Sequence, residues 1–217
     1  DNRPRLYAGM LAAGALGGYA MPAFPDATLD EIRHFVHEAG ARFALAEDQE
    51  QVDKMLDLRD QGATIEHIVY DDLRGLTAYA NPGLISWDAL QAKGAELVTR
   101  NPNLRNELIA RAQPEGPAVF VHSSGSTGKP KGVVLSHRNL LAGVRNAYQG
   151  GAFQFGESIL AYLPMAWVGD FAVTMGAGIV LHFTINIPER QETVLQNLRE
   201  IAPTFYLAAP RSWDNLL

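Results

Sequence analysis

Residues 119–137, VFVHSSGSTGKPKGVVLSH, place hydroxyl groups, glycines and two lysines between two apolar runs. Hydroxyls and the backbone N–H groups of a glycine-rich loop can bind anions, and glycine lets the backbone come close to a ligand. The residues of this kind are Ser124, Gly125, Ser126, Thr127 and Gly128. Lys129 and Lys131 add positive charge to the same loop, which suits a polyphosphate. We therefore expect a nucleotide ligand.

A stretch rich in glycine and serine could also be a flexible linker. The runs on either side, residues 118–121 and 133–135, are short, apolar and β-branched, as buried strands are. A linker would more often be flanked by polar, exposed residues. The pattern thus favours a binding loop held between two buried strands.

The spacing excludes two common phosphate loops. A Walker A loop would need glycine at position 123 and serine or threonine at position 130, where Ser123 and Pro130 stand. The glycines of the loop are three and four residues apart, which is not the Gly-x-Gly-x-x-Gly of dinucleotide-binding folds. Ser123 and Ser124 also lack the Gly-x-Ser-x-Gly elbow of a hydrolase nucleophile.

The ten residues SSGSTGKPKG, 123–132, resemble the signature loop of the adenylate-forming superfamily, which includes acyl-CoA synthetases, luciferases and the adenylation domains of peptide synthetases. The resemblance implies a loop that holds the β- and γ-phosphates of ATP and helps to place Mg²⁺ while a carboxylate attacks the α-phosphate. Its hydroxyl residues would bind phosphates and Mg²⁺: Ser123, Ser124, Ser126 and Thr127. Ser123 would be the Mg²⁺ contact, and Lys131 would offset charge on the departing pyrophosphate. His122 replaces the family's usual aromatic residue, such as Tyr, which implies different packing beneath the loop.

A second stretch, YLPMAWVGDF at residues 162–171, resembles the family's Leu-Pro-x-x-His motif in long-chain acyl-CoA synthetases, with Trp167 in place of histidine. The resemblance implies that Trp167 lies beside the acyl-adenylate and the acyl tunnel; the alternative is core packing. We expect Pro164 to end a strand and to direct the following residues to the edge of the sheet. An indole at this place could shield an adenylate, but it could not act as an acid or base.

The resemblance extends through residues 46–60 and 192–217, which look like long-chain fatty acid ligases. It implies an enzyme that converts a fatty acid and ATP to acyl-AMP and pyrophosphate, then transfers the acyl group to coenzyme A. Two alternatives are an adenylating enzyme for another carboxylic acid and a truncated, non-catalytic nucleotide-binding homologue. The chain starts without Met, and the family's later Glu, Asp and Lys have no counterpart before Leu217. We expect a piece of a longer protein that is inactive alone.

Composition indicates an ordinary globular protein. The chain has 217 residues, 47% of them hydrophobic, and a net charge of -6, which argues against a nucleic-acid partner. The absence of cysteine excludes disulfides and mildly favours the cytoplasm. Residues 6–25 carry no charge, but they are rich in glycine and alanine and interrupted by Pro22, so we expect neither a membrane span nor a signal peptide. Peripheral contact with a membrane and the oligomeric state stay open.

Two further clusters have structural explanations. His34 and His37 lie three residues apart, but no further ligands follow at the spacing of a metal site, so we expect surface histidines. The acidic residues 47–50 fit the first turn of a helix, where negative charge complements the dipole.

Alternating signals predict an α/β fold with layered parallel β-sheets covered by helices, part of the large N-terminal domain of an adenylate-forming enzyme. A boundary at Gln113–Pro117 divides it into two partial subdomains, residues 1–112 and 113–217, the second with the phosphate loop. We expect strands at residues 18–24, 43–46, 67–70, 118–121, 133–135, 159–163, 179–183 and 204–207. We expect helices at residues 4–15, 28–39, 52–59, 86–90, 104–112, 136–148 and 194–201, and one opening at Pro210.

Overall fold

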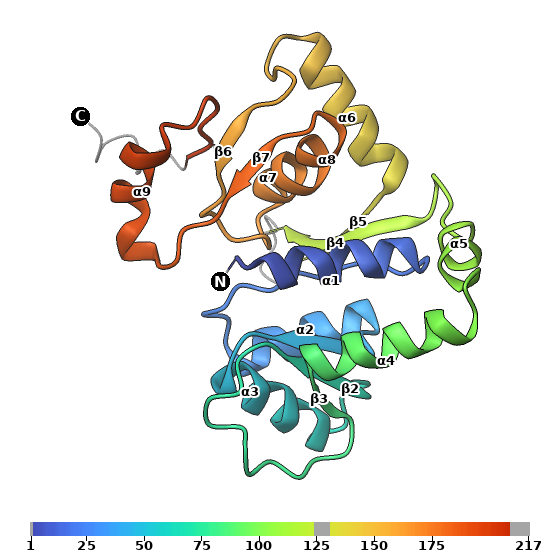
Figure 1. Ribbon diagram of the computed structural model, residues 1–217. Coiled ribbons are helices and arrows are strands. Elements are labelled where there is room, and N and C mark those ends of the chain that lie inside the picture. The colour runs from blue at the N-terminus through green and yellow to red at the C-terminus, as the bar shows by residue number, and fades with distance from the viewer. Residues whose placement is uncertain (1, 124–130, 209–217) are drawn as a thin grey trace.

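The computed structural model describes residues 2–123 and 131–208, in which helices cover three small sheets (Figure 1). Its helices are α1 (Pro4–Ala15), α2 (Leu29–Ala39), α3 (Gln49–Asp60), α4 (Trp87–Arg100), α5 (Leu104–Ile109), α6 (His137–Gln149), α7 (Val168–Phe171), α8 (Gly178–Val180) and α9 (Val194–Ile201). A π-helix, η1 (Ala172–Ala177), joins α7 to α8, and a 3₁₀ turn, η2 (Gln191–Thr193), precedes α9. The expected helix at Pro210 lies outside the described residues.

The first sheet is parallel, with the strand order β1–β2–β3. Strands β1 (Phe43–Ala46) and β2 (His67–Tyr70) have the expected bounds, whereas β3 (Leu84–Ser86) was not predicted. Three residues are too few to show an alternating pattern, so β3 left no signal in the sequence. A buried cluster joins this sheet to α2 and α3 through Ile32, Val36, Val52, Leu58 and Ile68.

Side-chain caps fix where several helices begin. Thr28 and Glu31 form the expected capping box of α2, and Gly40 ends that helix in the left-handed conformation, with φ of 59°. Asp48 caps α3, so the prediction that the acidic stretch begins a helix is confirmed. Ser86 caps α4 as expected, but the helix continues to Arg100 rather than ending at Leu90, while α5 stops at Ile109, short of Ala112.

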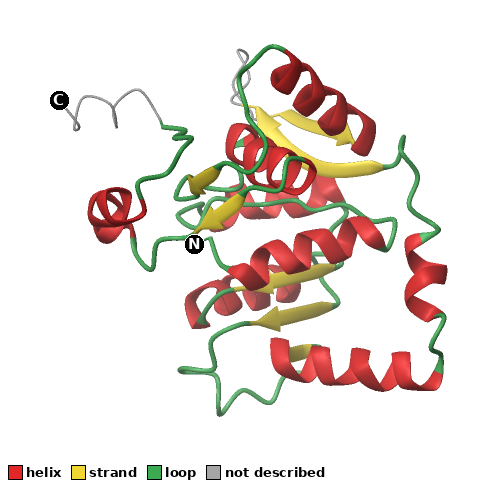
Figure 2. Cartoon of the chain, turned by 45° about the horizontal axis from the view of Figure 1, so that its top comes forward, coloured by secondary structure: helices red, strands yellow, loops and turns green. Residues whose placement is uncertain are grey.

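Strands β4 (Pro117–Ser123) and β5 (Lys131–Ser136) form an antiparallel pair, unlike the parallel strands predicted throughout (Figure 2). The expectation that both strands are buried is right for β4 and wrong for β5, where Val133 and Val134 are exposed. An expected strand at residues 18–24 is reduced to a single bridge between Ala20 and Val119, on the other edge of β4.

The last sheet pairs β6 (Ser158–Leu160) with β7 (Thr184–Asn186) in parallel. The strand predicted at residues 179–183 is wrong, because Ile179 and Val180 belong to α8 and β7 begins only at Thr184. Periodicity cannot separate a helix from a strand in so short an apolar run, and Ile179 and Val180 are exposed rather than part of a core strand. The strand predicted at residues 204–207 is reduced to a bridge between Phe205 and Ile159.

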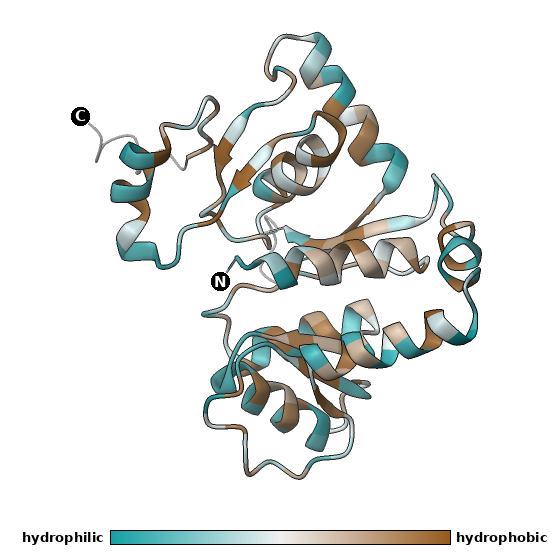
Figure 3. Cartoon of the chain, viewed as in Figure 1, coloured by the Kyte–Doolittle hydropathy of each residue, from teal (hydrophilic) through white to brown (hydrophobic). Residues whose placement is uncertain are grey.

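Helix α1 has the predicted bounds and packs against the strand that leads into the phosphate loop. Tyr7 and Met10 share a buried cluster with Val119, Met165 and Phe171. The helix thus contacts the second predicted subdomain although it belongs to the first, and the division at residue 112 stays a prediction. Figure 3 shows hydrophobic colour along β4 and the neighbouring turns of α1.

None of the helices in the described chain combines the length and the hydrophobicity needed to cross a membrane.

Candidate functional site

The β4–β5 ladder brings the two ends of the predicted phosphate loop together. Ser123 and Lys131 are register partners, and Ser123 Oγ lies 3.4 Å from the backbone oxygen of Lys131. Both residues are exposed. The other predicted phosphate-binding residues lie outside the described residues: Ser124, Gly125, Ser126, Thr127, Gly128 and Lys129. The structure therefore defines the stem of the loop, and the roles of these residues stay predictions.

Gly132 is required by the packing of this stem. A Cβ atom at this position would lie 2.2 Å from Cζ of the Phe120 ring, which covers the glycine from the facing strand. Real Cβ atoms do not approach other atoms so closely, so any side chain here would displace the ring. Glycine at the end of the motif thus lets the two strands pair while Phe120 stays buried.

His122, the residue before Ser123 on β4, packs against α2. Its ring stacks on Phe35 of α2, with centroids 3.7 Å apart, and meets the edge of Phe120 at 5.1 Å. Its Nε2 lies 3.3 Å from a carboxylate oxygen of Glu38, although the contact lacks hydrogen-bond geometry. Burial lowers the pKa of His122, and Glu38 offsets part of this effect. The imidazole of His122 thus packs on α2, and the expected difference from the family's packing stays a prediction.

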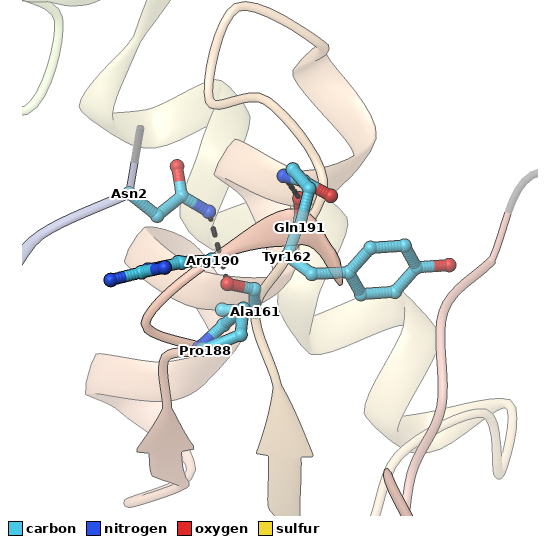
Figure 4. A pocket seen from close by; sticks show the side chains of 6 residues that line it. All are labelled: Asn2, Ala161, Tyr162, Pro188, Arg190 and Gln191. Atoms are coloured by element: carbon cyan, nitrogen blue, oxygen red, sulfur yellow. Dashed lines mark hydrogen bonds between the residues drawn. The ribbon is translucent and has the colours of Figure 1, made fainter. Parts of the chain in front are cut away.

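The segment that leads to Trp167 is held by side-chain amides from distant parts of the chain (Figure 4). Asn2 donates to the carbonyl oxygens of Ala161, at 3.1 Å, and Leu163, at 2.9 Å. Gln191 donates to the carbonyl oxygen of Tyr162 at 3.1 Å. Strand β6 ends at Leu160, opposite the end of β7 at Asn186, and not at Pro164, which corrects the expectation that the proline ends the strand.

Trp167 lies at the surface of the described chain, with 41% of its area exposed. Its ring lies over Gly169, where an added Cβ would come within 2.8 Å of the indole. Its backbone N–H donates to the carbonyl oxygen of Pro164 at 2.9 Å, so the motif forms a tight turn before α7. The indole is therefore not buried in the described core, and its contact with an acyl group stays a prediction.

Asp170 is a buried carboxyl group in the same motif, and sequence reasoning did not single it out. It is 3% exposed, its Oδ2 has no hydrogen-bond partner among the described residues, and burial raises its pKa to about 7. The hydroxyl of Tyr7 on α1 is also buried without a partner there, and its pKa is raised by burial and by the charge of Asp170. The only signal in the sequence was an acidic residue between glycine and phenylalanine.

One buried cluster connects the two predicted site segments. It contains Val119 and Val121 of β4, together with Met165 and Phe171 on either side of Trp167. The loop stem and the Trp167 segment therefore share one packed core, which fixes their separation. This arrangement could hold a triphosphate at one segment and a second substrate at the other.

The predicted Mg²⁺ contact, Ser123, lies at the loop stem, where β4 ends. The described chain contains no group of three or more His, Asp or Glu side chains that could form a metal site, and His34 and His37 gain no third ligand. Mg²⁺ needs no such cage, because it is often held by one or two protein oxygens, water and substrate phosphates. Ser123 Oγ, exposed at the loop stem, is an oxygen donor of this kind.

A cavity of about 820 Å³ lies between α1, α2 and β1. Its walls include Met10, Val36, Leu45 and Met165, but no residue of β4 or β5. This cavity is therefore separate from the loop stem.

A family model described as AMP-binding enzyme matches residues 1–217. The chain is 26% identical over 212 residues to a long-chain-fatty-acid–CoA ligase, ACSBG2, of Xenopus laevis, an alignment that covers 92% of this chain and 27% of the relative. It is 23% identical to ACSBG1 of Bos taurus, which carries the same enzyme description, over 100% of this chain and 30% of that protein. The chain thus spans about a third of the length of these relatives or less.

The fold is similar to that of a long-chain-fatty-acid–CoA ligase, FadD1, from Archaeoglobus fulgidus. The TM-score is 0.69 at 17% identity, and the match covers 99% of this chain and 39% of that one. A luciferase-like enzyme from the mealworm Zophobas morio gives a TM-score of 0.71 at 18% identity, over 97% of this chain and 46% of that one. These matches confirm the predicted α/β architecture.

Proposed function

Because the chain belongs to the AMP-binding enzyme family, as the match over residues 1–217 shows, we propose that it is part of an ATP-dependent ligase that activates a long-chain fatty acid. The enzyme would form acyl-AMP and pyrophosphate, then transfer the acyl group to coenzyme A. The observation that carries the proposal is the β4–β5 stem, which joins Ser123 to Lys131 at the ends of the motif SSGSTGKPKG.

In this proposal the loop stem binds the phosphates that leave. The exposed Lys131 begins β5 directly after the loop, where its ammonium group can approach the β- and γ-phosphates. A cation at this place stabilises the negative charge that develops on pyrophosphate as the bond to the α-phosphate breaks. Ser123 would contribute its hydroxyl to Mg²⁺, which would neutralise charge on the same phosphates when bound.

Trp167 would act on the other substrate. Its indole is exposed beside the turn at Pro164, and it presents a large apolar surface with one N–H donor. Such a surface can exclude water from a mixed anhydride, which hydrolyses readily, without taking part in proton transfer. We place the carboxyl end of the fatty acid near this indole.

An activated acid other than a long-chain fatty acid is a second candidate. Identity to the fatty acid ligases is only 23–26%, and the substrate is the property that varies most easily among enzymes of one fold. The experiment is to express the full-length polypeptide and measure AMP release with coenzyme A across acids from acetate to palmitate, with aryl and amino acids included. The proposal expects the highest kcat/KM with long chains; a preference for a short, aryl or amino acid would replace it with the second candidate.

A further inference from the structure

His122 is the last buried side chain on β4 before the chain enters the loop. The strand is buried from Ala118 to Val121, while Ser123 is exposed. The side chain of His122 is 8% exposed, although a histidine side chain usually reaches water. The contacts that fix the His122 ring therefore also restrict the backbone of the next residue, Ser123.

The ring is held by α2, a helix whose own position is firmly set. A capping box fixes the start of α2, and its buried residues Ile32 and Val36 pack it against the first sheet. From this helix Phe35 stacks on His122 at an interplanar angle of 27°, and Glu38 faces Nε2 at 3.3 Å. A second histidine of the same helix, His34, lies with its ring centroid 6.4 Å from that of His122.

Space filling alone does not explain an imidazole at this place. An apolar ring of similar size would fill the gap without the cost of burying a polar nitrogen. The ring nitrogen faces the Glu38 carboxylate at 3.3 Å without hydrogen-bond geometry, so the negative charge favours this orientation while the stack on Phe35 sets the plane of the ring. An oriented ring at the end of a strand fixes the direction in which the next residue leaves that strand.

We propose that His122 is a positioning residue: by stacking on Phe35 and facing Glu38, it fixes the start of the 123–132 loop relative to α2, so that Ser123 is directed toward the phosphates of ATP. This inference rests on the proposed function, in which the loop binds ATP. It assigns to α2, a helix far from the loop in the sequence, a share in nucleotide binding.

The test compares variants of the full-length polypeptide by ATP–pyrophosphate exchange. We expect His122→Ala to raise the KM for ATP about two- to tenfold, the factor that matches the loss of one aromatic pair. The KM for the fatty acid should stay constant, since the Trp167 segment does not contact the ring. His122→Phe keeps the stack on Phe35 but loses the nitrogen that faces Glu38, so it should restore only part of the ATP affinity. His37→Gln, an exposed change on the same helix, is the control and should behave as wild type.

A double-mutant cycle identifies the contact. If His122 acts through Phe35, the combination of His122→Ala with Phe35→Ala should raise the KM for ATP no further than either change alone. Additive effects would contradict the proposal. An unchanged KM for ATP, with only a lower melting temperature, would show that His122 is a structural residue and would overturn it.

A second measurement separates this inference from the proposed function. Hydrogen exchange of the peptide around residues 119–135, followed by mass spectrometry, reports on the loop stem whether or not the protein is an enzyme. We expect faster exchange in His122→Ala and exchange between that of His122→Ala and that of the wild type in His122→Phe. If the wild-type protein shows no ATP–pyrophosphate exchange but His122→Ala loosens the stem, the proposed function fails and the anchoring stands. If the stem exchanges equally in all variants, the anchoring is wrong.

Discussion

Ser123 and Lys131 lie opposite each other in the β4–β5 ladder although they are eight positions apart in the sequence, and Ser123 Oγ is 3.4 Å from the carbonyl oxygen of Lys131. An antiparallel pair of strands thus closes the loop at its base. Residues directly opposite in an antiparallel pair lie on the same face of the strands, which is why we assign both side chains to one bound polyphosphate.

Replacement of Lys131 tests this assignment. A hydrogen bond to a charged group contributes about 1.5–3 kcal/mol, so Lys131→Ala should slow acyl-adenylate formation by roughly ten- to a hundredfold. Single-turnover formation of acyl-AMP in the full-length protein measures this step. Lys129→Ala is the matched control and should have a smaller effect. Equal effects at both lysines would contradict the role given to Lys131.

Gly132 should not tolerate a side chain. Because a Cβ atom would come within 2.2 Å of the Phe120 ring, Gly132→Ala should lower the free energy of unfolding by about 1–3 kcal/mol, the usual cost of overpacking. Gly94→Ala on α4 is the control, since nothing lies within 4 Å of its added Cβ, and it should be neutral or stabilising. Urea unfolding of both variants measures the difference. Equal stability of the two would mean that Phe120 does not cover the glycine.

The buried carboxyl group of Asp170 should make the stability of the folded protein depend on pH. Its pKa is raised to about 7 from 3.8, so the folded protein holds a proton that the unfolded chain releases between these values. The folded state is therefore favoured at low pH by this group, and that advantage is lost as the pH rises through about 7. Asp170→Asn cannot ionise, so it should gain stability relative to the wild-type protein between pH 5 and pH 8. Melting temperatures at the two pH values measure this. A gain of the same size at both would show that Asp170 is not buried as a neutral acid.

Trp167 should affect the acyl substrate and not ATP. In the full-length enzyme Trp167→Ala should change chain-length preference or release more acyl-AMP to solvent, while the KM for ATP stays nearly constant. Trp167→Phe, which keeps an apolar ring, is the matched control. Ligation rates from acetate to palmitate decide the question. If the variant keeps the wild-type profile and loses only thermal stability, Trp167 packs the protein and does not contact the acyl group.

The elements with strong local signals could be predicted from the sequence. The capping residues Thr28 and Ser136 and the stop at Gly40 placed α2 and α6 correctly, because these signals depend on hydrogen bonds within a few residues. The prediction for the apolar run at residues 179–183 failed because hydrophobicity does not mean burial there: Ile179 and Val180 are exposed on α8. Only Leu181 and Phe183 of this run pack into a core, with Val144 of α6. Contacts with residues far away in the sequence determine the secondary structure of that segment.

In the candidate site too, local features could be predicted from the sequence and long-range contacts could not. The motif at residues 123–132 was identified by its resemblance to a family's signature loop, and strands lie on either side of it as expected. The contacts of His122 with α2, the amide of Asn2 on the carbonyl of Leu163 and the approach of Tyr7 to Asp170 could not be read. Each joins residues that are far apart in the chain, and no local pattern encodes such a pairing.

ATP–pyrophosphate exchange by the full-length polypeptide, with a fatty acid and without coenzyme A, tests the central claim most directly. The account predicts that labelled pyrophosphate enters ATP only when the acid is present, because the acyl-adenylate forms reversibly at the loop between Ser123 and Lys131. Binding of ATP without exchange for any carboxylic acid would contradict it and would favour a non-catalytic nucleotide-binding homologue.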